Sequence, residues 1–330
     1  MTYTNTLLAQ PPSVATSNVE QFQLDVIEGL SNTPKKLFSK YFYDRNGDQL
    51  FQQIMEMPTY YLTKCELEIF RNKTSDLASA INFKDSPFDL IELGAGDAMK
   101  SSYLLNYLVN EQVDFTYRPI DISGHILSEL QDKLSAEMPT LEIDCMQGEY
   151  FQMLAKATMV SQRRKVVLFL GGNIGNMELE EAYRFCKELR SNLHPGDLVL
   201  IGFDLKKNPH QILAAYNDKT GITAAFNLNL LARINSELGA NLQLNNFSHY
   251  QNYDPVSGAC RSYLVSLVDQ QVNICGKQLT FTANELINME ISQKFLQEQI
   301  AELATKSGFL NQQEISDSKN WFIDAVWMAK

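Results

Sequence analysis

The chain has 330 residues, and its 45% hydrophobic fraction is enough for a core in one or two domains. Its formal net charge of −11 argues against broad binding to nucleic-acid phosphates, which requires a basic face. The five cysteines and four histidines lack the spacing of a disulfide framework or a metal site, so we expect no metal. There is no stretch of membrane-span length and no secretion signal, so we expect a cytoplasmic protein.

The N-terminal part of the chain is predicted to be mainly helical. Residues 1–18 are polar and predict a flexible arm. Apolar residues at helical spacing predict helices at Val19–Leu30 and Asp48–Met55. Thr63 is placed to cap a further helix from Lys64 to about Ala80.

Strands and helices alternate from residue 88 onwards. The predicted strands are Phe88–Leu93, Phe115–Asp121, Leu141–Met146, Lys165–Leu170 and Leu198–Asp204. The helices predicted between them are Met99–Val109, Ser123–Glu137, Tyr150–Ala157 and Leu179–Leu193. This alternation predicts a parallel sheet with right-handed crossovers.

The pattern changes in the last third of the chain. Pro209–Leu238 predicts two helices separated at Gly221, and Ser248–Thr282 predicts antiparallel strands. Glu290–Ser307 reads as a helix and Trp321–Ala329 as a last strand. We therefore expect a β-rich segment inserted in the α/β unit, which resumes near residue 293.

A glycine turn ends the first strand of the alternation, in the sequence Glu92-Leu93-Gly94-Ala95-Gly96. Met99 stands where a dinucleotide or phosphate-loop motif requires glycine, so neither motif matches. What remains is the Glu-x-Gly-x-Gly form usual in S-adenosylmethionine (SAM) methyltransferases. Asp121 ends the next strand, where a carboxylate can accept both ribose hydroxyls. The alternative is an ordinary α/β domain with a glycine turn and a strand-end aspartate.

Other polar side chains follow the predicted strands. Asn176 lies in a glycine-rich turn after the fourth strand, at the sheet edge where ligands bind, but could instead cap the next helix. Glu149 follows the third strand and could hold an adenine amine or be a solvated loop residue. The hydroxyl of Tyr216 could reach a polar ligand, although Tyr216, like Tyr43 and Tyr60, could also be a packing residue.

Glu290 and Ser292 lie where the β-rich segment rejoins the α/β unit, a junction that favours ligand pockets. Spaced two apart, they could bind the two nitrogens of an imidazole or another polar side chain. The alternative is that Ser292 caps a helix and Lys294 is solvated.

Together, several segments resemble one family, the histidine Nα-methyltransferases of ergothioneine biosynthesis. The resemblance runs from about Pro34 to Phe322, and its order and spacing are specific although each segment is modest alone. These segments are Tyr41–Asp44, Pro58–Thr63, Glu92–Gly96, Pro119–Ser123, Ile174–Asn176, Ala215–Asp218, Thr223–Asn227 and Glu290–Ser292.

The resemblance implies an α/β, Rossmann-like class I SAM-dependent methyltransferase fold with a second α+β substrate-binding domain. It implies a substrate-binding domain at 19–63 and 207–292 and a methyltransferase domain at 64–206 and 293–330. The residues that it places on SAM are Gly94, Gly96, Lys100, Asp121, Glu149 and Tyr150. Those that it places on the amino-acid substrate are Tyr60, Asn176 and Tyr216, with Asn176 and Tyr216 on the carboxylate, and Glu290 and Ser292 on the imidazole. Catalysis would rest on positioning by Tyr43, Tyr60 and Asn176.

The implied reaction is transfer of methyl groups from SAM to the α-amine of L-histidine, repeated to the trimethyl betaine hercynine. We expect a monomer that acts on a free amino acid, with no nucleic-acid or membrane partner. The chain departs from the family at Cys260–Ser262, where Ile-Glu-Met is common, at Met289, where Thr is usual, and at Leu62, where Pro is usual. These departures leave open a different amine substrate, such as a tryptophan derivative, and a SAM-binding protein without catalysis is a further alternative.

Overall fold

The computed structural model describes residues 18–81 and 86–330. The described chain groups into two compact units. Unit 1 takes residues up to 49, 224–249 and 263–289, and unit 2 takes 50–223, 250–262 and 290–330. The predicted flexible arm lies outside the described residues except for Asn18, which begins the first helix. The predicted boundaries differ from these units at 50–63, 207–223, 250–262 and 290–292, which group with unit 2; which segments hold the substrate stays a prediction.

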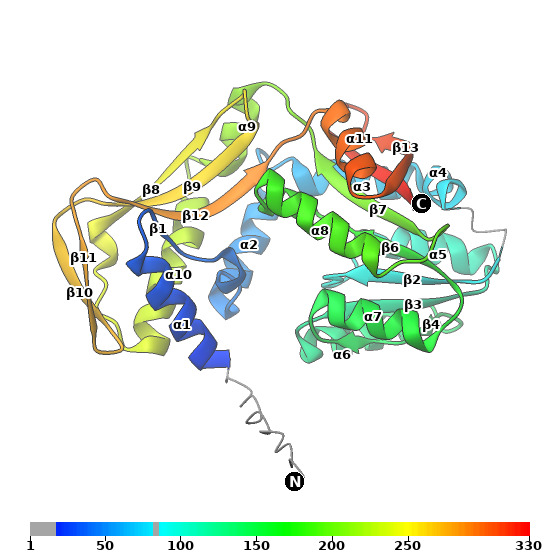
Figure 1. Cartoon of the computed structure of the whole chain (residues 1–330), viewed down its shortest axis with the longest axis horizontal. Coiled ribbons are helices and arrows are strands. Elements are labelled where there is room, and N and C mark those ends of the chain that lie inside the picture. The colour runs from blue at the N-terminus through cyan, green and yellow to red at the C-terminus, as the bar shows by residue number, and fades with distance from the viewer. Residues whose placement is uncertain (1–17, 82–85) are drawn as a thin grey trace, which may run out of the picture. The chain divides into compact units, whose positions relative to one another are not determined.

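Unit 2 is built on a sheet with eight strands among the described residues (Figure 1). Its order is β13-β14-β7-β6-β2-β3-β4, and the short β5 also pairs with β3. The strands are β2 (Phe88–Leu93), β3 (Phe115–Asp121), β4 (Glu142–Ile143), β5 (Met146–Gln147), β6 (Arg164–Phe169), β7 (Leu198–Asp204), β13 (Phe309–Ser316) and β14 (Phe322–Ala329). The pairs from β7 to β4 are parallel, whereas β14 runs antiparallel to both β7 and β13.

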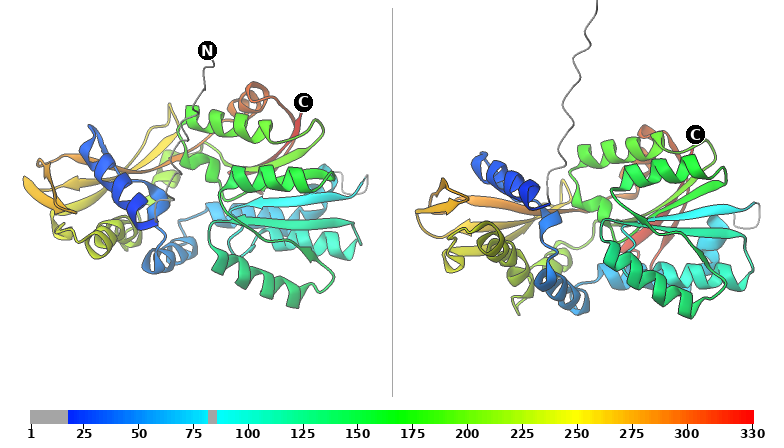
Figure 2. Two further views of the ribbon diagram at one scale, coloured as in Figure 1. Left: turned by 60° about the horizontal axis from the view of Figure 1, so that its bottom comes forward. Right: turned by 90° about the horizontal axis from the view of Figure 1, so that it is seen from below.

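Helices cover both faces of this sheet (Figures 1 and 2). Alternate residues of a strand point to opposite faces, so β7 sends Leu200 into one apolar layer and Ile201 into the other. The first layer packs on α3 (Leu62–Asn72), α4 (Thr74–Ala80), α5 (Ser101–Asn110), α6 (Gly124–Glu137) and α9 (Pro209–Tyr216). The second packs on α7 (Tyr150–Val160), α8 (Leu179–Ser191) and α11 (Gln297–Lys306), and a short 3-10 helix, η2 (Asn173–Asn176), follows β6.

Unit 1 contains α1 (Asn18–Ser31), the first turn of α2 (Arg45–Glu56) and most of α10 (Ile222–Leu238). It also holds η1 (Ser39–Tyr41), η3 (Leu244–Asn246) and the antiparallel hairpin of β10 (Gln270–Ile274) and β11 (Lys277–Phe281). A four-stranded sheet has the order β1-β12-β9-β8. Its strands are β1 (Lys35–Lys36), β8 (Phe247–Tyr253), β9 (Ala259–Ser266) and β12 (Leu286–Gln293), of which the last three run from one unit into the other.

Most of the predicted α/β pattern is confirmed, and the boundaries of β2, β3 and β7 match. The single helix predicted at Lys64–Ala80 is wrong, because α3 ends at Asn72 and α4 begins at Thr74. Thr63 lies inside α3 and does not cap it, since the N-cap position is Tyr61.

Two further differences concern strands. The helix predicted at Glu290–Ser307 is wrong in its first part, where β12 continues to Gln293 and α11 begins only at Gln297. The strand predicted at Leu141–Met146 is reduced to β4 and β5, and β13 was not predicted. Among the described residues, the structure holds no helix with both the length and the apolar character needed to cross a bilayer.

Candidate functional site

The glycine turn after β2 is open on one side. Gly94 and Gly96 have φ angles of +70° and +53°, a left-handed conformation that favours glycine. A Cβ on Gly94 would lie 2.6 Å from the hydroxyl oxygen of Tyr150, whereas a Cβ on Gly96 would meet nothing within 4 Å. The backbone at Gly96 is therefore accessible to a ligand, and Tyr150 borders the turn.

The end of β3 lies beside this turn, since Gly94 N–H donates to the Ile120 carbonyl at 2.9 Å. One oxygen of Asp121, Oδ1, accepts the Ser123 backbone N–H at 2.9 Å. Burial, together with the charges of Asp121 and Glu149, raises the pKa of Tyr150 to about 12. Glu149 is exposed at the N-cap position of α7 and its side chain makes no capping bond. The structure thus brings Gly94, Asp121, Glu149 and Tyr150 together.

Lys100, another predicted SAM residue, forms an ion pair with Glu66 of α3. Both carboxylate oxygens of Glu66 also accept the backbone N–H of Gly171, at 2.8 and 2.9 Å. Glu66 therefore joins Lys100 to the turn after β6. Sequence analysis did not select Glu66, although a charged residue on the buried face of α3 between Leu62 and Ile69 is a detectable signal.

Glu92, the acidic residue of the glycine motif, is buried and accepts the hydroxyl of Tyr117 at 2.6 Å. Burial raises the pKa of Glu92 to about 7. Asp324 of β14 is also fully buried, and burial and the charge of Glu66 raise its pKa well above the ordinary range. Buried acids thus lie near Lys100.

The predicted substrate residues form a second cluster. The hydroxyl of Tyr216, on α9, lies 2.7 Å from the hydroxyl of Ser292 on β12, and the Tyr60 ring lies 6.1 Å from the Tyr216 ring in a T-shaped arrangement. Glu290 precedes Ser292 by two residues, so the two side chains share a face of β12. Burial raises the pKa of Glu290 to about 7, opposed by the charge of Lys294.

Asn176, which ends η2, is exposed. A Cβ on the preceding Gly175 would lie 2.8 Å from the Gln293 carbonyl oxygen, so this turn packs closely on the end of β12. The alternative role of Asn176 as a helix cap is wrong, because Glu178 caps α8 in a capping box with Glu181. The structure therefore brings the Asn176 turn next to the strand that carries Ser292.

Two other expectations have different outcomes. The alternative in which Ser292 caps a helix and Lys294 is solvated is wrong, because Ser292 lies on a strand and Lys294 is fully buried. Tyr43 belongs to unit 1, where its half-exposed ring lies 5.8 Å from that of Phe226. Its positioning role stays a prediction.

A buried ionic cluster that the sequence did not predict is centred on Asp204, the last residue of β7. Asp204 Oδ2 accepts the Tyr61 hydroxyl at 2.8 Å and Lys294 Nζ at 2.6 Å. Asp204 Oδ1 pairs with Lys207, whose ammonium lies 4.2 Å from the centre of the Tyr61 ring. Asp204, like Asp121, ends a strand that the sequence predicted. The pairing of Asp204 with Lys207 and Lys294 could not be read from the sequence.

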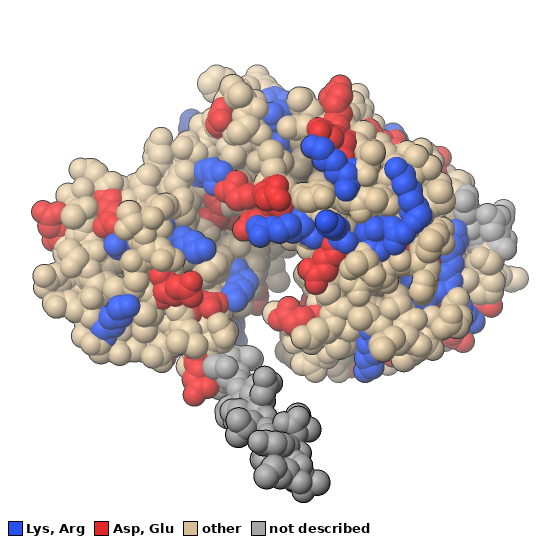
Figure 3. Space-filling model, viewed as in Figure 1, with Lys and Arg blue, Asp and Glu red and all other residues tan. Residues whose placement is uncertain are grey.

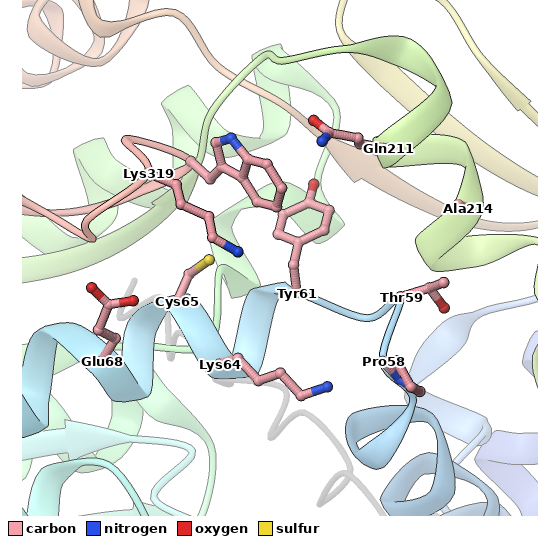
Figure 4. A pocket seen from close by; sticks show the side chains of 10 residues that line it. Pro58, Thr59, Tyr61, Lys64, Cys65, Glu68, Gln211, Ala214 and Lys319 are labelled. Carbon is pink, nitrogen blue, oxygen red and sulfur yellow. The ribbon is translucent and has the colours of Figure 1, made fainter.

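A cavity of about 290 Å³ is lined in part by Tyr61 and by none of the predicted site residues (Figure 4). Its lining residues are Pro58, Thr59, Tyr61, Lys64, Cys65, Glu68, Gln211, Ala214, Lys319 and Trp321. Burial raises the pKa of the Cys65 thiol to about 12, so this thiol is not activated as a nucleophile.

We predict that Glu92→Gln alters stability in a pH-dependent way. With a folded-state pKa near 7 against an ordinary value of 4.5, the folded protein binds more protons at Glu92 than the unfolded chain does between these values. The stability that this adds is complete below about pH 4.5 and is lost as the pH rises through 7. The free energy of unfolding of the variant, relative to wild type, should therefore rise by up to about 3 kcal/mol across that window. Urea unfolding at pH 5 and pH 8 measures this, and an equal difference at both pH values would contradict it.

Comparison with known proteins identifies the family of this chain. The model of a family described as histidine-specific, SAM-dependent methyltransferases matches residues 22–329. Histidine N-alpha-methyltransferase of Mycolicibacterium smegmatis is 35% identical over 293 residues, which cover 88% of this chain and 89% of that protein. The protein of the same name from Mycobacterium tuberculosis is 34% identical over 283 residues, covering 85% and 86%. Ergothioneine biosynthesis protein 1 of Schizosaccharomyces pombe is 29% identical over 83% of this chain and 36% of its own length. The chain therefore belongs to the histidine-specific, SAM-dependent methyltransferases, and unit 2 has their Rossmann-like class I fold, as the sequence predicted.

Proposed function

We propose that this methyltransferase acts on the α-amine of L-histidine and repeats the transfer until the trimethyl betaine hercynine is formed. The observation that carries the proposal is the cluster of Tyr216, Ser292 and Glu290, two hydroxyls and a carboxyl group with a shifted pKa. Such a cluster suits an amino acid with a polar side chain. The names of the relatives and the family match across 22–329 support the same substrate.

We propose that SAM lies along the carboxyl ends of β2 and β3. The accessible backbone at Gly96 would lie against it, and the Asp121 carboxylate would accept its ribose hydroxyls. Glu149 and Tyr150 would contact the adenine, and Lys100 would contact the amino-acid part. The bound group supplies a methyl that its positive sulfur already activates, so the residues of the chain need only bind and orient.

The substrate residues would hold both ends of histidine and leave its α-amine free. Burial raises the pKa of Tyr216 well above its ordinary value, so its hydroxyl keeps its proton and can donate to the substrate carboxylate together with Asn176. The Glu290 carboxylate would accept an imidazole N–H. Holding the reactants in line can contribute about 7–11 kcal/mol, and the amine must lose its proton to solvent before each transfer.

The segment Cys260–Ser262 differs from the residues common in the family, and the structure around it favours histidine over an indole substrate. A tryptophan derivative would call for a larger and more apolar pocket there. Instead Gln251 is buried against both ends of the segment, with its side-chain amide donating to Cys260 Sγ at 3.1 Å and its carbonyl accepting from the Ser262 hydroxyl. These buried polar groups suit an imidazole better than an indole, which would favour an apolar lining.

We propose a monomer that acts on a free amino acid in the cytoplasm without nucleic-acid or membrane partners. The net charge of −11 supports the absence of nucleic acid, and acidic and basic side chains are interspersed on the face shown in Figure 3. Sedimentation of the purified chain would give its oligomeric state.

We predict that the protein, incubated with SAM and L-histidine, yields mono-, di- and trimethylated histidine in succession by mass spectrometry. A parallel incubation with tryptophan and 4-dimethylallyltryptophan should yield little product, because the segment Cys260–Ser262 carries buried polar groups rather than an apolar lining. Turnover of the indole compounds alone would overturn the histidine assignment. SAM binding without turnover of any amino acid would favour a protein without catalysis.

We predict that Glu290→Gln lowers kcat/KM for histidine at pH 8 by roughly 10-fold or more, since a neutral amide accepts the imidazole N–H less strongly than a carboxylate. In wild type, kcat/KM should fall as the pH drops through about 7, where Glu290 takes up a proton. The variant should lose this contribution and keep only the titration of the substrate. SAM affinity serves as the control, and an unchanged histidine affinity would remove Glu290 from the site.

We predict that Glu66→Gln weakens SAM binding by about 10-fold, because the variant loses the charge that holds Lys100. Glu68→Gln is the matched control on the same helix, since Glu68 accepts the Ser318 backbone N–H and lines the separate cavity of Figure 4. Calorimetric titration with SAM compares the two variants. Equal SAM affinities in the two variants would show that the proposed contact of Lys100 with SAM does not depend on Glu66.

A further inference from the structure

Lys294 is a fully buried cation that donates hydrogen bonds to two of the predicted substrate residues, Tyr216 and Ser292. Its backbone is fixed because its N–H donates to the Gly258 carbonyl at 2.8 Å and the next N–H, of Phe295, donates to the Asp204 carbonyl at 2.9 Å. The side chain thus projects from a strand end whose position the sheet determines. The proposed reaction assigns no role to this residue.

The ammonium of Lys294 has three N–H donors, and the structure provides three oxygens for them. Nζ lies 2.6 Å from Asp204 Oδ2, 2.7 Å from the Tyr216 hydroxyl and 2.8 Å from the Ser292 hydroxyl. Because an ammonium cannot accept a hydrogen bond, both hydroxyl oxygens must act as acceptors toward Lys294.

This fixes where the two hydroxyl protons can go. The oxygens of Tyr216 and Ser292 are 2.7 Å apart, so one hydroxyl donates to the other. Two protons are available, one is used in this mutual bond, and neither can point at Lys294. One proton remains, and it must point away from the lysine.

We propose that Lys294 is a positioning residue for the substrate, acting through Tyr216 and Ser292. By occupying an acceptor site on each hydroxyl, it makes the pair present one hydrogen-bond donor to the bound amino acid. The pair therefore binds an acceptor group, a carboxylate oxygen or an unprotonated ring nitrogen, and disfavours a protonated amine or imidazolium at this point. This rests on the proposed function.

The same carboxylate provides a matched control. Lys207 also uses its three donors, on Asp204 Oδ1, on the Leu205 carbonyl and on the Tyr61 hydroxyl. It therefore shares Asp204 with Lys294 but contacts neither Tyr216 nor Ser292. In either single variant Asp204 keeps one cation and the Tyr61 hydroxyl, so the buried charge stays paired.

The test compares Lys294→Met with Lys207→Met in the full chain. We expect Lys294→Met to raise KM for L-histidine about 10-fold or more, with kcat at saturation changed less than about threefold and SAM affinity unchanged, because only substrate contacts are altered. Lys207→Met should leave KM for histidine within about threefold of wild type. Lys294→Gln keeps two N–H donors without the charge, and we expect an intermediate KM.

A double-mutant cycle separates positioning from a structural role. In the Tyr216→Phe background one of the two hydroxyls is already absent, so Lys294→Met should raise KM by a smaller factor than in wild type. If Lys294→Met raises KM by the same factor in both backgrounds, or if Lys294→Met and Lys207→Met have equal KM values, this inference is overturned and the proposed function is not. Wild-type protein that binds no histidine would instead overturn the proposed function, and this inference with it.

Discussion

The Asp204 carboxylate is the constraint on which the candidate substrate site depends. A buried charge is costly unless it is paired and hydrogen-bonded, and Asp204 has Tyr61, Lys207 and Lys294 as partners. These partners come from the start of α3, from the chain just after β7 and from the end of β12. Satisfying one carboxylate therefore holds three segments at the carboxyl end of β7, and the backbone bond from Phe295 to Asp204 reinforces this.

The turn after β6 connects the two clusters of candidate site residues. At one end Gly171 donates to Glu66, which also holds Lys100 beside the glycine turn. At the other end Gly175 packs on the backbone of Gln293, next to Ser292. Because both ends are fixed to other elements of unit 2, a substrate placed by Asn176 would be held at a defined distance from a group bound at Gly96. Transfer of a methyl in line requires this kind of fixed separation.

The sequence predicted what depends on local pattern. The apolar runs of β2 and β7 are buried on both faces, so their lengths could be read directly, and Gly94 was selected because its left-handed turn favours glycine. The region from Glu290 to Lys294 was misread as helix with a solvated lysine, because its polar residues are satisfied by partners distant in sequence. The edge strand β13 is mostly polar, so it lacks the apolar run from which the other strands were predicted. Family resemblance placed Tyr216 and Ser292 on the substrate, which stays a prediction, but neither pattern nor resemblance pointed to Lys294.

Under the proposed function, selectivity would come from the direction of hydrogen bonds more than from the shape of the pocket. Tyr216 keeps its proton because burial raises its pKa, while Glu290, with a pKa near 7, can become an acceptor at mildly alkaline pH. The Tyr216 donor would then hold the substrate carboxylate, while the Glu290 acceptor would hold the N–H of a neutral imidazole. Alkaline pH also yields the neutral α-amine that must attack the methyl group. The same rise in pH would therefore prepare the enzyme to hold the side chain and the substrate to react, so both requirements favour catalysis on the alkaline side of neutrality.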